Sequence, residues 1–159
     1  RLAVLEAVLK LYRDPDRLPE RLPTLRTFTR PQAEIAAAAE RVRAPIATAV
    51  GSGFSVRAAP CASQIGSGAQ PLETLPSAGI AIMPADRKGA GTRLETLNQA
   101  FRSLPTPVIG RVKDGAFILD LRCLDDEAGF IAQLDQLKFK RLATEITEHT
   151  EKSKTGNIK

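Results

Sequence analysis

The segment 108–124, VIGRVKDGAFILDLRCL, constrains the fold most strongly because it reads as a β-hairpin. Asp114 and Gly115 make a favoured two-residue turn, since both central positions of a type I′ turn take a positive φ. Pairing outward from this turn aligns Lys113–Ala116, Val112–Phe117, Gly110–Leu119 and Val108–Leu121. The last three pairs build an apolar face, and the opposite face carries Ile109, Arg111, Ile118, Asp120 and Arg122. The segment therefore predicts two antiparallel strands whose register is set by the turn.

Apolar residues at helical or alternating spacing outline the remaining elements. Helices are predicted over 1–14, 31–50, 92–104 and 125–137, and strands over 54–60 and 77–84. Residues 16–29 contain two prolines and are expected to form an irregular connector. Pro45 is expected to kink or split the second helix, and Thr92 to cap the third. This order of elements predicts an α+β fold, in which a small, mostly antiparallel sheet carries helices on one face.

The chain is expected to have three parts. Residues 1–50 are connecting helices, residues 51–137 a small α+β domain, and residues 138–159 a charged, divergent tail. The 159 residues suffice for one domain with a real core. Because the first residue is Arg rather than Met, we expect a fragment or a processed chain. No apolar run reaches membrane-spanning length and no signal peptide is visible, so we expect a cytoplasmic protein without membrane contact.

The net charge of +5 is concentrated at the C-terminal end. From Lys138 onward there are six basic and three acidic residues, which accounts for +3 of the total. A basic tail of this kind can bind nucleic acid. No aromatic residues alternate with the basic ones, so the tail has no surface on which bases could stack.

A glycine-containing loop, CASQIGSGAQP, spans residues 61–71. A P-loop would need Lys-Ser/Thr after its last glycine, and a dinucleotide fingerprint would need a helix there. Here the loop leads to a predicted strand, so both phosphate-binding interpretations fail. The loop is either a plain link between strands or a polar binding loop, for which Ser63, Gly66 and Gly68 are the candidate residues.

Two arginines and a carboxylate share one face of the predicted hairpin. Arg111 lies opposite Ile118, which makes Asp120 its diagonal neighbour, and Arg122 follows two residues further along. A carboxylate beside a guanidinium can orient it to bind an anion such as a carboxylate or a phosphate. The alternative is a solvated ion pair of little energetic consequence. Arg111 and Arg122 are therefore candidate anion-binding residues, with Asp120 as the orienting group.

The other reactive residue types offer little chemistry. Cys61 and Cys123 are too few and too far apart for a zinc site, and we expect reduced thiols. His149 is the only histidine, and no nucleophile or metal partner accompanies it. The acidic run 125–127 is expected to begin a helix, where the helix dipole favours carboxylates. The residues alone thus demonstrate no enzyme, and they predict no metal site and no catalytic residue in this chain.

Three unrelated stretches together resemble one family. They are LEAVLKLYRDPDRLPERLPTLRTFTRP near the start, CASQIGSG…LPSAGIAI in the middle and LPTPVIGRVKDGAFILDLRCLDDE near the end. They occur in the order found in the C-terminal part of the bacterial L-seryl-tRNA(Sec) selenium transferases, also called selenocysteine synthases. The resemblance covers roughly residues 2–137.

The resemblance implies a pyridoxal-phosphate enzyme of the aspartate-aminotransferase type, of which this chain would form the small C-terminal domain. In that family the cofactor lysine binds the seryl group of seryl-tRNA(Sec), water is eliminated, and selenium from selenophosphate adds. A large homo-oligomer is also implied. By the same analogy, the SQIGSG loop would face the domain interface, with Arg111 or Arg122 near the substrate.

The chain departs from the family pattern in one decisive respect. The family's Schiff-base lysine lies upstream of the leucine-rich block, and none of the eight lysines here occupies that position. The arginines that help hold the selenium donor and the part that contacts tRNA are also missing. We therefore expect the isolated chain to be inactive. The alternative is a stand-alone, non-catalytic interaction module with a basic tail.

Overall fold

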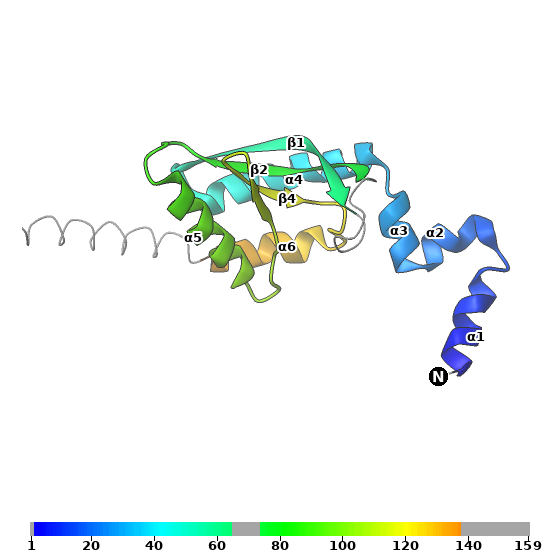
Figure 1. The fold of residues 1–159 in the computed structure, drawn as a ribbon. Helices are drawn as coiled ribbons and strands as arrows, with labels where there is room; N and C mark the ends of the chain where they lie inside the picture. Colours follow the sequence, from blue (N-terminus) through cyan, green and yellow to red (C-terminus); the bar gives the residue numbers. More distant parts are fainter. Residues whose placement is uncertain (1, 65–73, 138–159) are drawn as a thin grey trace, which may run out of the picture.

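The computed structural model describes residues 2–64 and 74–137 and has a four-stranded antiparallel sheet with helices on one face (Figure 1). The strand order is β1-β2-β4-β3. The strands are β1 (Phe54–Gln64), β2 (Thr74–Pro84), β3 (Arg111–Lys113) and β4 (Ala116–Asp120). The helices packed on the sheet are α4 (Gln32–Val50), α5 (Ala90–Arg102), α6 (Glu127–Gln133) and the 3-10 turn η2 (Leu134–Gln136). This arrangement confirms the predicted α+β class.

The β3–β4 hairpin has the predicted register, with Val112 opposite Phe117. Asp114 and Gly115 have φ angles of 52° and 73°, as a type I′ turn requires. The ladder is shorter than expected, because β3 has only three residues and the two outer predicted pairs are not part of it. Val112 is 49% exposed, since β3 is the edge strand. The sequence therefore predicted the turn and the register correctly, but overestimated the length and burial of β3.

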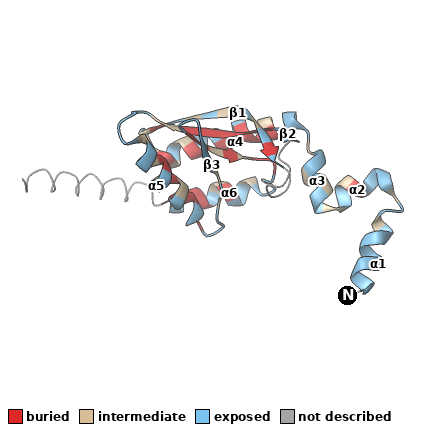
Figure 2. Cartoon of the chain, in the orientation of Figure 1, coloured by how far each residue is buried: buried red, intermediate tan, exposed pale blue. Residues whose placement is uncertain are grey.

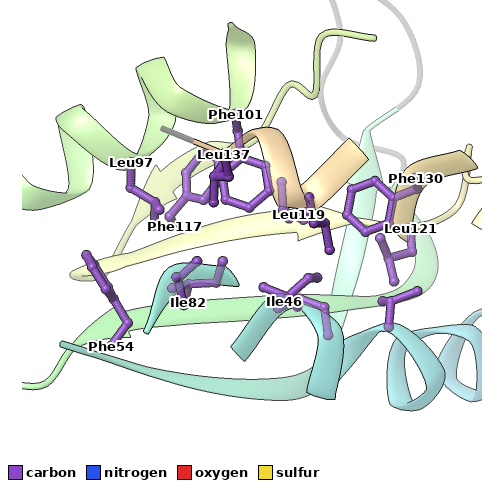
Figure 3. Packing of buried hydrophobic residues seen from close by; sticks show 14 of the residues in the cluster. Ile46, Phe54, Ile82, Leu97, Phe101, Phe117, Leu119, Leu121, Phe130 and Leu137 are labelled. Atoms are coloured by element: carbon purple, nitrogen blue, oxygen red, sulfur yellow. The ribbon is translucent and has the colours of Figure 1, made fainter. Parts of the chain in front are cut away.

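The hydrophobic core fills the space between the sheet and its helices (Figure 3). Alternate residues of the central strands face it, as expected for a sheet with one covered face. The Phe101 ring of α5 packs against the Phe117 ring of β4, with centroids 5.5 Å apart. The fully buried side chains from α4 and the sheet include Ile35, Val42, Ile46, Ile80, Ile82, Phe117 and Leu119.

Residues 16–29 are helical except for the extended Leu22, not irregular as expected. They contribute to η1 (Pro15–Arg17), α2 (Leu18–Arg21) and α3 (Pro23–Thr29). The prolines of α2 and α3 lie in the first turn of each helix. A missing N–H breaks no intrahelical hydrogen bond there, so these prolines begin helices rather than prevent them.

Two further local expectations concern Pro45 and Thr92. Pro45 does not split α4, which continues through it to Val50; Val42 and Ile46, fully buried on either side of it, hold both halves against the sheet. Thr92 does not cap α5, which begins at Ala90 after Gly89 in the left-handed region, with a φ of 67°. Glycine adopts this conformation at no steric cost, so the loop ends earlier than the sequence pattern indicated.

An N-terminal arm, which we define as residues 2–31, extends away from this body (Figure 1). It begins with α1 (Leu2–Leu11), none of whose residues is buried (Figure 2), and continues through η1, α2 and α3. Within the described ranges, no helix combines the length and the apolar character that crossing a bilayer requires.

Candidate functional site at the end of the central strands

A buried polar network lies where β1, β2 and β4 come together, and Asp120 is its centre. The Ser63 hydroxyl donates to Asp120 Oδ2 at 2.6 Å, and the Ser77 hydroxyl donates to Asp120 Oδ1 at 2.7 Å. The backbone N–H of Arg122 also donates to Oδ1, at 3.1 Å. Ser63, Ser77 and Arg122 are all buried. The carboxylate thus accepts three hydrogen bonds inside the protein, which a surface ion pair would not do.

Arg122 is 5% exposed, and all three guanidinium nitrogens donate to protein oxygens. Its Nε donates to Ser63 Oγ at 3.0 Å, so the Ser63 hydroxyl bridges the guanidinium and the Asp120 carboxylate. Nη2 donates to the Pro76 carbonyl. Nη1 lies within 3.0–3.2 Å of the carbonyls of Thr27, Phe28 and Arg30.

These last carbonyls belong to the C-terminal end of α3 and the residue that caps it. The last carbonyls of a helix have no intrahelical partner and carry partial negative charge. Arg122 therefore donates hydrogen bonds to the unpartnered carbonyls at the end of a helix more than 90 residues away in the chain. These charged hydrogen bonds attach the N-terminal arm to the sheet.

Arg30 makes the complementary connection. Its Nη1 donates to the carbonyls of Leu121, Arg122 and Leu124 at 3.3, 3.3 and 2.8 Å, and its Nε donates to Glu34 at 3.1 Å. The arm and the end of β4 are thus joined by two guanidinium groups that point in opposite directions. Nothing in the spacing of the sequence indicated a role for Arg30.

Arg111 is the exposed cation beside this network. It lies opposite Ile118 as predicted, and its Nη2 donates to the Ala62 carbonyl at 3.0 Å. Ala62 stands between Cys61 and Ser63 on β1. Arg111 therefore reaches the same end of the sheet as the buried network while its own side chain remains accessible to solvent.

Cys61 lies beside Ser77 in the sheet register, close to the same charges. Burial and then the negative charge of Asp120 raise the pKa of the Cys61 thiol above its usual value, outweighing the opposite effects of a hydrogen bond with Ser77 and of the charges of Arg111 and Arg122. A raised pKa keeps the sulfur protonated near neutrality, which does not favour a nucleophilic thiolate.

The structure brings together three of the predicted site residues, Ser63, Asp120 and Arg122, with Arg111 adjacent. Asp120 orients Arg122 through Ser63 rather than Arg111 by direct contact. Gly66 and Gly68 lie outside the described residues. Ser77 was not among the predicted residues, although a serine beside the otherwise apolar stretch AGIAIMP is a detectable signal.

The described residues fit neither a metal nor a Schiff-base cofactor. No cluster of three or more potential metal ligands occurs between 2 and 64 or between 74 and 137. A lysine that binds pyridoxal phosphate needs an enclosed environment that lowers its pKa. Lys10, Lys88 and Lys113 are all exposed, so the described part of the chain holds no suitable lysine.

Comparison with known proteins assigns the family. A family model described as L-seryl-tRNA selenium transferase matches residues 1–125. The chain is 54% identical over 144 residues to the L-seryl-tRNA(Sec) selenium transferase of Methylocella silvestris, covering 90% of this chain and 30% of that protein. The corresponding protein of Rhizobium meliloti is 50% identical over 137 residues, covering 86% of this chain and 28% of the relative.

The L-seryl-tRNA(Sec) selenium transferase of Escherichia fergusonii is 51% identical over 133 residues, which is 84% of this chain and 28% of that protein. The chain thus spans less than a third of the length of these relatives, and it corresponds to their C-terminal part. With a family match over most of its residues and about half of its aligned positions identical to these relatives, the chain belongs to the L-seryl-tRNA selenium transferase family.

Proposed function

We propose that this chain forms the C-terminal domain of a selenium transferase that converts seryl-tRNA(Sec) to selenocysteinyl-tRNA(Sec) with selenophosphate as the selenium donor. The observation that carries the proposal is the match of 84–90% of this chain to 28–30% of proteins named for this activity. In this proposal pyridoxal phosphate is held by a lysine outside the chain, the complete enzyme is a homo-oligomer, and the isolated chain has no activity.

The role proposed for this domain is to complete the substrate pocket with a cation. Arg111 suits this role better than Arg122, because all three guanidinium nitrogens of Arg122 already donate to protein oxygens. Arg111 is exposed and uses one nitrogen on the Ala62 carbonyl. Its guanidinium offers further donors in a fork that matches a carboxylate or phosphate. Ser63, Gly66 and Gly68 would shape the adjoining loop, with Ser63 and Asp120 holding its base.

The test is a chimera in which the C-terminal segment of the Rhizobium meliloti relative is replaced by the matching segment of this chain. The chimera, the relative without that segment and the isolated chain are each given seryl-tRNA(Sec) and radiolabelled selenophosphate. We expect label on the tRNA only with the chimera. A chimera that is folded and oligomeric but transfers no selenium would contradict the proposal.

The role of Arg111 is tested in the same chimera. Arg111→Ala should lower kcat/KM by about tenfold or more, which corresponds to the loss of one charged hydrogen bond. The matched control is Lys113→Ala, which removes another exposed cation two residues along the same strand. Equal activities of the two variants would contradict the role of Arg111 in the substrate pocket. They would not contradict the assignment of the chain as the C-terminal domain.

A further inference from the structure

The hairpin opens into a cavity beside the end of β4. The ladder between β3 and β4 ends at the Arg111–Ile118 pair, so the next pair of the predicted register, Ile109 with Asp120, is not formed. A cavity of about 440 Å³ lies at this point, between residues 106–109, the end of β4 and α6. We call it the hairpin cavity.

The floor of the hairpin cavity is apolar. Leu119, Leu121 and Phe130 line it and are at most 7% exposed (Figure 3). Ile109 also lines the cavity, and it is 65% exposed. An apolar side chain that enters the cavity would leave water together with part of Ile109, which favours binding of an apolar group.

The Gln133 side chain supplies a buried hydrogen-bond donor. Gln133 lines the cavity and is 8% exposed. Its Oε1 accepts from the Thr106 N–H at 3.0 Å, whereas its Nε2 donates to no atom of the residues that the structure describes. A largely buried amide without an acceptor is costly, so an acceptor brought by a ligand would stabilise this group.

The backbone of Asp120 points toward the same gap. The N–H of the next residue, Leu121, donates to the Ala78 carbonyl on the β2 side. Successive residues of a strand direct their backbone groups to opposite sides, so the N–H and C=O of Asp120 point away from β2. On that side β3 is no longer paired with β4. The two groups can therefore pair with one residue of an extended peptide.

The charge around the hairpin cavity is negative. Its charged lining residues are Asp120, Asp125 and Asp126, and no lysine or arginine from the described ranges lines it. Asp125 is paired with Arg26 at 2.8 Å. The Asp126 carboxylate accepts from the Gly129 N–H, and it forms no ion pair with any described residue. A cationic group would therefore complement Asp126.

We propose that the hairpin cavity binds an extended segment of a partner protein, in which a lysine or arginine precedes apolar residues at alternating positions. The backbone of the segment pairs with Asp120, and one of its carbonyls accepts from Gln133. Its apolar side chains lie on the floor of the cavity, and its cation lies near Asp126. A strand antiparallel to β4 begins at the end of β4 that leads to Asp126, so the basic residue comes first. This inference goes beyond the proposed function and does not depend on it.

The test is a titration of the isotope-labelled full chain with the peptide acetyl-Lys-Val-Thr-Val-amide, followed by two-dimensional NMR. We expect saturable shifts of the Asp120 backbone amide and of the Gln133 side-chain NH₂ group. The peptide acetyl-Glu-Val-Thr-Val-amide should bind more weakly by about tenfold or more, because a repulsive charge replaces an attractive one.

Two variants with matched controls locate the binding site. Asp126→Asn removes a charge but keeps the acceptor for the Gly129 N–H, and Ile109→Ser changes an exposed side chain, so both should fold. Each should weaken binding of the lysine peptide by about threefold or more. The controls are Asp86→Asn and Val112→Ser, at an exposed carboxylate and an exposed apolar residue that do not line the cavity. They should leave the affinity unchanged.

Four results would overturn the inference. The first is a titration without saturable shifts at Asp120 and Gln133. The second is equal affinity for the lysine and glutamate peptides. The third is binding by this chain but not by the Rhizobium meliloti chimera, which would mean that the rest of the enzyme covers the cavity. The fourth is binding only after removal of residues 138–159, which would identify the basic tail of the chain itself as the occupant.

Discussion

Arg30 and Arg122 each bind the backbone of the other. The Arg122 guanidinium donates to the Arg30 carbonyl at 3.1 Å, and the Arg30 guanidinium donates to the Arg122 carbonyl at 3.3 Å. This reciprocal pair joins the N-terminal arm to the end of β4 without any contact between opposite charges. Each guanidinium carries several N–H donors in a fixed plane. It can therefore donate to several backbone carbonyls at a point where the chain is not helical and these carbonyls lack a helical partner.

Replacing Arg122 should therefore destabilise the fold. Arg122→Met leaves the carbonyls of the α3 end and Ser63 without their donor, and we expect a loss of about 3 kcal/mol in the free energy of unfolding. Arg122→Lys should also destabilise, because an ammonium cannot reproduce the planar fork. Urea denaturation followed by circular dichroism measures both. The control is Arg87→Ala at an exposed loop position, and an Arg122→Met curve that coincides with this control would contradict the structural role.

Gly79 lies opposite Asp120 and has no room for a side chain. A Cβ atom at this position would lie 2.0 Å from the Leu119 carbonyl oxygen, which is backbone and cannot move aside. Gly79→Ala should cost about 2 kcal/mol or more by separating β2 from β4. Gly91→Ala is the matched control, since a Cβ there meets nothing within 4 Å and alanine favours the helix. In thermal melts, Gly79→Ala should lower the unfolding midpoint and Gly91→Ala should raise it. A Gly79→Ala variant as stable as the parent chain would mean that β2 and β4 lie further apart than in this structure.

Glu127 should make the free energy of unfolding depend on pH in the acidic range. The hydrogen bond from Arg41 lowers the pKa of Glu127 below its ordinary value of 4.5. Because the folded pKa is the lower one, the stabilising contribution is present above pH 4.5 and is lost as the pH falls through the folded pKa. The difference in unfolding midpoint between the parent chain and Glu127→Gln should be small at pH 7 and shrink further below pH 4.5. A difference in unfolding midpoint that grows as the pH falls would show that folding raises the pKa of Glu127 instead of lowering it.

The two thiols should differ in reactivity. Cys123 is exposed, whereas Cys61 is partly buried and its pKa is raised by burial and by Asp120. Iodoacetamide at neutral pH should alkylate Cys123 first, because the thiolate is the reacting form. Peptide mass spectrometry gives the two rates. Faster labelling of Cys61 would mean that Arg111 and Arg122 outweigh burial and lower its pKa.

The hairpin and the helices on one face of the sheet could be predicted because each depends on local signals. Asp114-Gly115 determines its own turn, and the apolar spacing of 92–104 determines a helix whatever surrounds it. The prediction failed where a local rule competed with position or packing. The general rule makes Pro19 and Pro23 helix breakers, although each lies where a helix begins, and Pro45 stays helical because its neighbours are buried.

The candidate site was predictable only in part, for a physical reason. Arg111, Asp120 and Arg122 could be placed together because one hairpin register relates them. Ser63, Ser77 and Arg30 join them through strand pairing and long-range contacts, with partners between 43 and 94 residues away. No local pattern encodes such contacts. The sequence therefore predicted Arg122 only as a candidate anion-binding cation. The fold shows that it is buried and that it joins the N-terminal arm to the end of β4.

The most direct test of the central claim is selenium transfer by the Rhizobium meliloti chimera carrying this chain as its C-terminal segment. The account predicts radiolabelled selenium on tRNA(Sec) with the chimera and none with the relative that lacks the segment. A folded chimera that leaves the seryl-tRNA(Sec) unlabelled would contradict the claim that this chain completes a selenium transferase.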